Sequence, residues 1–224
     1  MLAVFMSVIL AVGCVAGGTV AWLVAKTDDV VNTFTFGDIN IKLDEAKVDI
    51  NGNPLDENGN IVDDPAKADR ITGADVNEQN QYKLVPKAEY LKDPTVTVLA
   101  NSEKCWLFIS VKEDIAFVAE KTSEENFATY VSYSVDTGTA EAQGWIELEG
   151  ATTAEGEKVY YRIVELKETD QSFNVLKDNK VSVNENLTKE QIELLDGNPT
   201  LTFKAYAVQY SGFATALDAW KVTS

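Results

Sequence analysis

The most regular set of oxygen ligands in the sequence lies between residues 49 and 64. The stretch DINGNPLDENGNIVDD contains a seven-residue echo, DINGNPL followed by DENGNIV. Carboxylates and amides recur at alternate positions, and Ca²⁺ prefers such oxygens. The candidate calcium ligands are Asp49, Asn51, Asn53, Asp56, Asn58, Asn60 and Asp63.

A solvated loop of tight turns is the alternative interpretation of this stretch. It contains two Asn-Gly pairs, which favour turns because both residues tolerate positive φ. An EF-hand loop needs a Gly at its sixth position and a Glu at its twelfth, and neither fits here. Both interpretations stay open, and we expect no cofactor unless these loops take up calcium.

Enzymatic chemistry has little support in the rest of the chain. The 224 residues include no His, which removes the commonest general base and metal ligand. Phosphate-loop, nucleophile-elbow, dinucleotide-binding and Cys-x-x-Cys patterns are absent. The acidic pairs at 28–29, 63–64 and 124–125 are interpreted as solvated faces. We therefore expect a protein that is not an enzyme and assign no catalytic residue.

The charge balance narrows the range of partners. The chain has 19 Lys and Arg against 36 Asp and Glu, a formal charge of −17. Phosphate backbones and anionic lipid surfaces require clustered cations. We expect no nucleic-acid partner.

Two cysteines are present, Cys14 and Cys105. Cys14 lies in an apolar leader that we expect to be removed, so the mature chain would keep one thiol and no internal disulfide. Cys105 lies in the apolar run CWLFISV, which favours a buried structural role over a reactive one.

The leader resembles an export signal. Residues 1–22 contain no charged side chain, and 2–16 have the length of a signal-peptide apolar core. Thr19 and Ala21 supply small side chains at the −3 and −1 positions, so we predict cleavage between Ala21 and Trp22. A retained membrane anchor and a lipoprotein acylated at Cys14 are the alternatives. The expected protein is secreted, with membrane contact only before cleavage.

Several segments of the chain resemble a known family. GGTVAW at 17–22, the spacer KTDD and then NTFTFGDINIKLDE at 32–45 are similar to the start of the TasA- and camelysin-like proteins of Gram-positive bacteria. The segments 82–98, 102–111 and 201–220 are also similar to secreted members. The resemblance covers about half of the chain.

This resemblance implies a jelly-roll domain that is a subunit of biofilm-matrix fibres, matured by an ER-type signal peptidase often called SipW. Camelysin-like proteins have been described as metallopeptidases. A His-Glu-x-x-His zinc site is impossible without His, so we disfavour that activity here.

The strand pattern predicts an all-β fold. Short runs with period-two alternation occur at 32–43, 95–99, 105–111, 130–135, 145–148, 159–166, 172–176, 181–183 and 201–210. This pattern predicts an antiparallel, jelly-roll-like β-sandwich with two or three short helices in loops. We expect a signal peptide at 1–21 and one domain at 22–224, with an extended segment at 22–36 and a polar insertion at 49–81.

Both faces of the run 105–111 are apolar. Cys105, Leu107, Ile109 and Val111 have one parity, and Trp106, Phe108 and Ser110 the other. The run is therefore expected to be a central strand, with its second face covered by the same chain or by another subunit.

Two or three short helices are expected. A Thr-x-x-Gln capping box at Thr188 and Gln191 opens one that Gly197 ends. The others are a turn at 123–128 and a final turn within 213–220.

Aromatic residues permit a second function. Trp106, Trp145, Tyr160 and Tyr161 could stack on sugars from a sandwich face, which would make a carbohydrate- or surface-binding module. Core packing is the commoner use of such side chains.

The hypothesis that the protein polymerises accounts for more features of the sequence than the sugar-binding hypothesis does. Cleavage before Trp22 would free an apolar end, and an extended terminus can add a strand to the next subunit. Such a contact is head-to-tail and builds a filament of this protein with itself. The candidate donor-strand residues are Trp22, Leu23, Val24, Val30, Val31, Phe34 and Phe36. The alternative is that 22–36 folds back on its own domain, which is favoured for 30–36.

Overall fold

The computed structural model describes residues 38–72, 79–114, 131–138, 143–151, 153, 157–193 and 200–223. All of them belong to the compact unit Gly37–Ser224. The predicted leader, cleavage site, donor-strand residues and helical turn at 123–128 lie outside these ranges. The same holds for the first half of the predicted 32–43 strand pair.

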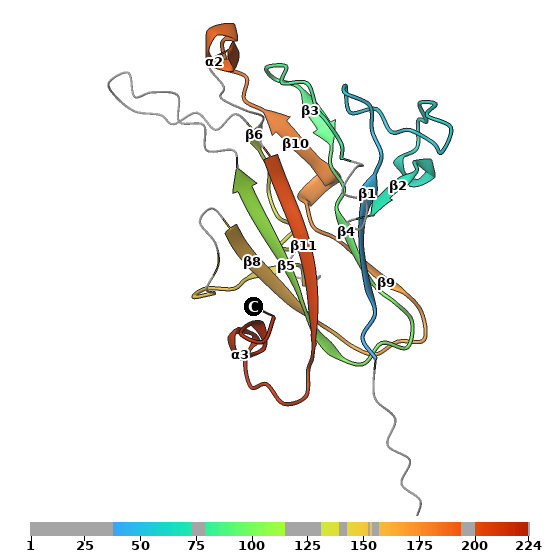
Figure 1. Cartoon of the computed structure of the whole chain (residues 1–224), viewed down its shortest axis with the longest axis vertical. Coiled ribbons are helices and arrows are strands. Elements are labelled where there is room, and N and C mark those ends of the chain that lie inside the picture. The colour runs from blue at the N-terminus through green and yellow to red at the C-terminus, as the bar shows by residue number, and fades with distance from the viewer. Residues whose placement is uncertain are drawn as a thin grey trace, which may run out of the picture. The chain divides into compact units, whose positions relative to one another are not determined.

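The described part of the chain forms three antiparallel sheets, which confirms the all-β class (Figure 1). The first sheet has the order β2 (Arg70–Thr72), β1 (Ile41–Ala46), β4 (Thr95–Val98) and β9 (Gln171–Asn174). The second has the order β3 (Glu89–Leu91), β10 (Lys180–Val183) and β6 (Val131–Ser132). The third has the order β11 (Thr200–Gln209), β5 (Cys105–Asp114), β8 (Glu157–Val164) and β7 (Ile146–Glu147).

Strand β5 is central, as its two apolar parities predict. It pairs with β11 along all ten residues, from Cys105 opposite Gln209 to Asp114 opposite Thr200. On its other side it pairs with β8, from Cys105 opposite Val164 to Lys112 opposite Glu157.

The inner face of β5 forms the main core of the sandwich. Cys105, Leu107, Ile109 and Val111 are at most 1% exposed. They belong to one apolar cluster with the buried valines of β4 and β10, which come from the other two sheets. Burial of side chains between facing sheets defines a β-sandwich. The jelly-roll form of the sandwich stays a prediction.

The outer face of β5 is covered by the C-terminal helix α3 (Ala216–Trp220). Phe108 belongs to a second apolar cluster with Ala216, Ala219 and Trp220. The ring centroid of Trp220 lies 5.5 Å from that of Phe108 and 5.2 Å from that of Tyr206. The second face of β5 is therefore covered by the same chain.

One side of the sandwich is sealed by Trp145, which is 1% exposed. Its indole Nε1 donates to the carbonyl of Asn174, the last residue of β9, and its backbone N–H donates to the carbonyl of Asp136. A side chain at the neighbouring Gly144 would come within 2.2 Å of the backbone at Gly138. Only glycine lets the chain approach this closely.

The capping box at Thr188 is confirmed. The N–H of Gln191 donates to Thr188 Oγ1, and the N–H of Thr188 donates to Gln191 Oε1, at the start of α2 (Lys189–Glu193). The final helical turn is confirmed as α3, which Thr215 caps.

Some predicted bounds were wrong. Within the described residues, the predicted strands 130–135 and 145–148 contain only the two-residue strands β6 and β7. Strands β2 and β3 were not predicted, because each has three residues and lies in a polar surrounding.

We expect Trp220→Ala to destabilise the fold by roughly 3–5 kcal/mol, since the cavity would open against Phe108 and Tyr206. Urea unfolding followed by fluorescence measures the change in the free energy of unfolding. Val222→Ala is the control, because Val222 is 59% exposed and should cost little. An equal loss in both variants would show that α3 does not cover the core.

Candidate assembly surface

The two halves of the 49–64 repeat form the same turn. In the first, Asp49 Oδ1 accepts from the N–H groups of Asn51 and Asn53, and Asp49 Oδ2 accepts from Asn53 Nδ2. In the second, Asp56 makes the same bonds to residues two and four positions later. The shared pattern D-x-N-G-N therefore encodes a turn that its own carboxylate holds.

These hydrogen bonds favour the ionised form of both carboxyl groups. Hydrogen bonds, the largest from the Asn53 side chain, lower the pKa of Asp49, and hydrogen bonds led by the Asn60 backbone lower the pKa of Asp56. The described residues include no group of three or more His, Cys, Asp or Glu placed to hold a metal ion. The turn-rich loop is confirmed, and calcium binding stays a prediction.

The polar insertion is tied to the first sheet by ion pairs. Arg70 Nε donates to Asp44 Oδ1 at 2.7 Å, and Arg70 Nη1 donates to Asp93 Oδ2 at 2.6 Å. Asp93 is 7% exposed, and its other oxygen accepts from the N–H of Ala46. Removing one partner of such a pair leaves a poorly solvated charge. Sequence reasoning missed this link, because Arg70 lies between 23 and 26 residues from its partners.

The one thiol in the described residues is structural. Cys105 is fully buried, and burial raises its pKa to about 11. A thiol with a raised pKa is a poor nucleophile. The prediction of a buried Cys105 is confirmed.

Most of the candidate sugar-stacking residues belong to the core. Trp106, Trp145 and Tyr160 are each at most 7% exposed, and Tyr161 packs against Trp106 and Phe108. A sugar ring needs an accessible aromatic face, so this set does not form the stacking strip that the carbohydrate hypothesis requires.

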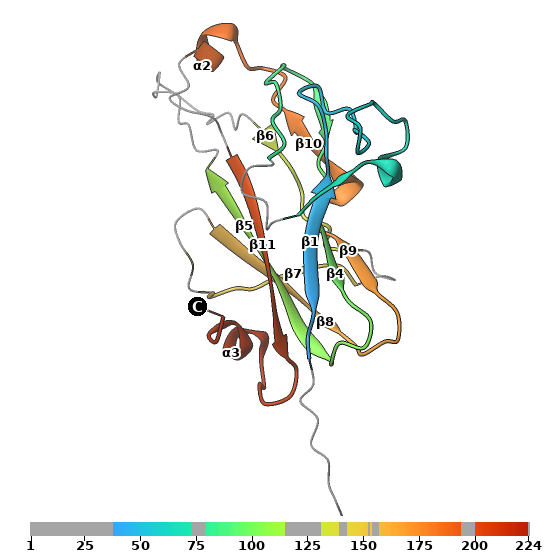
Figure 2. The ribbon, with the colours of Figure 1, turned by 45° about the vertical axis from the view of Figure 1, so that its right-hand side comes forward.

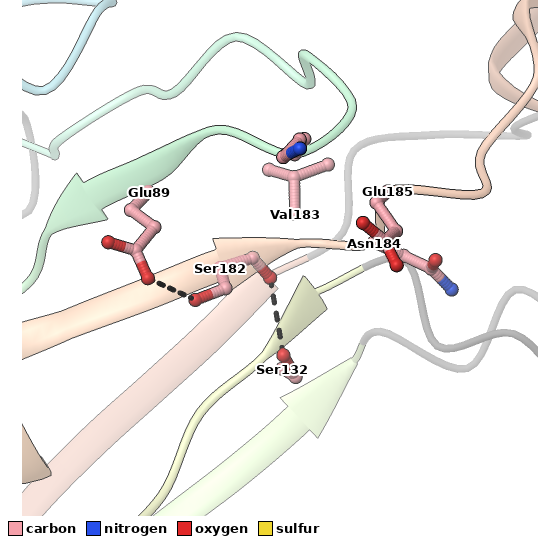
Figure 3. A pocket seen from close by; sticks show the side chains of 7 residues that line it. Glu89, Ser132, Ser182, Val183, Asn184 and Glu185 are labelled. Carbon is pink, nitrogen blue, oxygen red and sulfur yellow. Dashed lines mark hydrogen bonds between the residues drawn. The ribbon is translucent and has the colours of Figure 1, made fainter.

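An open hollow of about 600 Å³ lies on the second sheet (Figure 3). Ser182 donates to Glu89 at 3.5 Å, and Ser132 donates to the carbonyl of Ser182. Glu89 is also paired with Lys180 at 3.0 Å. At 3.5 Å the contact between Ser182 and Glu89 is at the outer limit of a hydrogen bond, which is too long to activate the hydroxyl. The hollow offers polar contacts and no activated nucleophile among the residues that line it.

Strand β11 is an open edge of the third sheet. Its ten residues pair with β5 on one side only, and no other described strand pairs with it. An unpaired edge presents a row of N–H and C=O groups to which another strand can bond. The neighbouring element across the sandwich is β1, as Figure 2 shows.

The apolar side chains along this open edge are only half-buried. Those of β11 and of the chain at β1 pack against the main core but keep part of their surface exposed, unlike those of β4 and β5. They are Ile39, Ile41, Leu43, Leu201, Phe203, Ala205 and Ala207. We call this set the β1–β11 seam. It combines apolar surface with unpaired main chain.

The sequence predicted the strands that contribute to the β1–β11 seam, but it did not predict that these strands lie side by side. The alternation of Ile39, Ile41 and Leu43 and the strand at 201–210 were predicted. Their position at a sheet edge was not, because strand order is a long-range property. The predicted donor residues lie outside the described ranges, so the structure places no donor against the seam.

No protein-family profile, curated protein or solved structure matches the chain. None of the helices in the described part of the chain has the length and hydropathy that a membrane crossing requires.

The lowered pKa of Asp49 predicts how its turn responds to acid. A carboxyl group whose pKa is depressed by folding stabilises the turn above its unfolded pKa and loses this effect as the pH falls through the folded pKa. We expect the amide NMR signal of Asn53 to titrate below the ordinary aspartate value of about 3.9. In Asp49→Ala this titration should vanish at Asn53 and persist at Asn60. A midpoint at or above the ordinary value would contradict the turn.

Proposed function

We propose that the protein is a secreted, non-enzymatic β-sandwich that forms the repeating subunit of an extracellular matrix or surface fibre. The observation that carries this proposal is the β1–β11 seam, where half-buried apolar side chains lie beside a ten-residue open strand edge. The resemblance of the leader and of NTFTFG to the TasA- and camelysin-like proteins supports it, and we propose the jelly-roll form for the sandwich on the same ground.

The occupant of the seam is residues 22–29 of the next copy, freed by signal peptidase cleavage before Trp22. A strand rises about 3.4 Å per residue, so eight residues span about 27 Å and the ten residues of β11 about 34 Å. One donor segment therefore fits along the edge. In this proposal, residues 30–36 link the donor segment to the subunit that it comes from.

Two kinds of interaction hold the donor. Main-chain hydrogen bonds to β11 supply affinity, and alternate apolar side chains such as Trp22 and Val24 cover the seam and set the register. Because donor and acceptor lie on different parts of the subunit, the contact is heterologous and repeats without closing. The sealed side at Trp145 offers no second seam of this kind in the described residues.

Deletion of residues 22–29 from the mature protein should give a folded monomer that forms no fibres. Negative-stain microscopy and size-exclusion chromatography measure assembly, and thermal unfolding measures the stability of the monomer. Fibres of normal length from the deletion variant would overturn the donor-strand proposal. A monomer of much lower stability than the intact monomer would show instead that the segment folds back on its own domain.

A substitution in the seam tests the acceptor. Ala205→Glu should abolish fibres by placing a charge against the donor, and circular dichroism with thermal unfolding establishes that this half-buried position accepts the carboxylate in a folded domain. Thr202→Glu is the matched control, with the same new side chain on an exposed position of the same strand. Thr202→Glu should form fibres like the parent. Fibres from a folded Ala205→Glu variant would exclude this acceptor edge.

A further inference from the structure

A lysine, a carboxylate and an amide meet at the boundary between the polar insertion and the first sheet. Lys92 Nζ lies 2.6 Å from Glu45 Oε2. Asn80 Nδ2 donates to the other oxygen of the same carboxylate, Glu45 Oε1, at 3.0 Å. Glu45 therefore holds an amine and an amide side by side.

The surroundings of this cluster are poor in water. The side chain of Lys92 is 11% exposed and that of Glu45 is 17% exposed. The ammonium of Lys92 lies 5.8 Å from the ring centre of Tyr82 and 5.6 Å from that of Phe203. Burial, with smaller effects of Glu45 and Asp93, raises the pKa of Tyr82. The low exposure and the two rings separate the Lys92–Glu45 pair from bulk water.

The amide of Asn80 is also oriented and polarised. Its Oδ1 accepts from the N–H of Val48 at 2.9 Å, and its Nδ2 donates to the carbonyl of Ala46 at 2.8 Å as well as to Glu45. A fixed N–H at the carbonyl oxygen is the donor that a tetrahedral oxyanion needs. The carboxyl group at Nδ2 is placed to protonate a leaving amine.

We propose that Lys92 and Asn80 form a covalent side-chain amide bond, with Glu45 as the proton acceptor and donor. This modification is independent of the fibre function, since it joins two segments of one chain. It would tie the polar insertion to the chain that leads into β4.

The reaction balances without an external reagent. Glu45 accepts a proton from the Lys92 ammonium, and the neutral Nζ attacks Cγ of Asn80. The oxyanion forms on Oδ1 beside the Val48 N–H. Glu45 then transfers the proton to Nδ2, and the Cγ–Nδ2 bond breaks. Nζ still carries two hydrogens at this point, and Glu45 passes one of them to the departing ammonia, which leaves as ammonium. Nζ retains one hydrogen, its other two depart with the former amide nitrogen as ammonium, and Glu45 ends as a carboxylate.

Peptide mapping of the purified full-length or secreted protein tests the proposal. An acylated Lys92 is not a trypsin site, so the digest should contain one branched peptide in which 71–83 is joined to 88–104. Its mass should be that of the two linear peptides less one ammonia. Unlinked 71–83 together with 88–92 and 93–104 as the main products would overturn the proposal.

Two variants test the roles of the residues. Glu45→Gln keeps a side chain of the same shape but removes the proton acceptor, and Lys92→Arg keeps a cation whose guanidinium stays protonated. Neither variant should give the branched peptide. Each should have the full mass calculated from its sequence, without the loss of one ammonia that the parent shows, and each should unfold at a lower temperature than the parent. A branched peptide in Glu45→Gln would overturn the role of Glu45.

Glu89→Gln is the matched control. Glu89 pairs with Lys180 on the exposed side of the second sheet, so this variant should keep the branched peptide. Ammonia loss can also arise from succinimide formation at the Asn-Gly pairs 51–52 and 58–59. Loss of ammonia without the 71–83 to 88–104 branch would therefore count against the proposal.

Discussion

Strand β5 has to exclude water from both of its faces, and the rest of the described fold follows from that requirement. Its inner side chains need the facing sheets, and its outer aromatic side chains need a separate cover. Helix α3 supplies that cover with only five residues, because Trp220 reaches both Phe108 and Tyr206. The C-terminal segment is therefore part of the core architecture, and it covers Trp106 and Phe108 on the outer face of β5.

The two open sides between the facing sheets of the sandwich are covered to different extents. Near β8 and β9 the chain crosses the gap and buries Trp145, which satisfies its indole N–H on a backbone carbonyl. Near β1 and β11 the described chain leaves apolar side chains half-exposed beside a long unpaired strand edge. Open edges invite strand addition. This asymmetry is the physical basis of the head-to-tail assembly that we propose, in which one seam takes one occupant.

The polar insertion shows how an acidic chain uses its few cations. Arg70 and Lys92 each contact carboxylates on or beside β1, and Asn80 bonds to the backbone on either side of Lys47. The aspartates of the repeat are occupied by their own turns. The turns at Asp49 and Asp56 are therefore held by their own hydrogen bonds, whereas Arg70 and Asn80 attach the insertion to the first sheet. At this attachment to the first sheet, Lys92 and Asn80 both contact the carboxylate of Glu45.

The sequence by itself determined the properties that depend on near neighbours. Period-two alternation predicted β4, β5, β8 and β11, the Thr188 and Gln191 spacing predicted the start of α2, and the Asn-Gly pairs predicted the turns at Asp49 and Asp56. Burial of both faces of β5 also followed from its residues. Strand order, the open edge of β11, the contact of Arg70 with Asp44 and Asp93, and the meeting of Lys92 with Asn80 at Glu45 were decided only by the tertiary structure. Local patterns fix which face of a strand is apolar, whereas long-range packing decides which strand lies beside it.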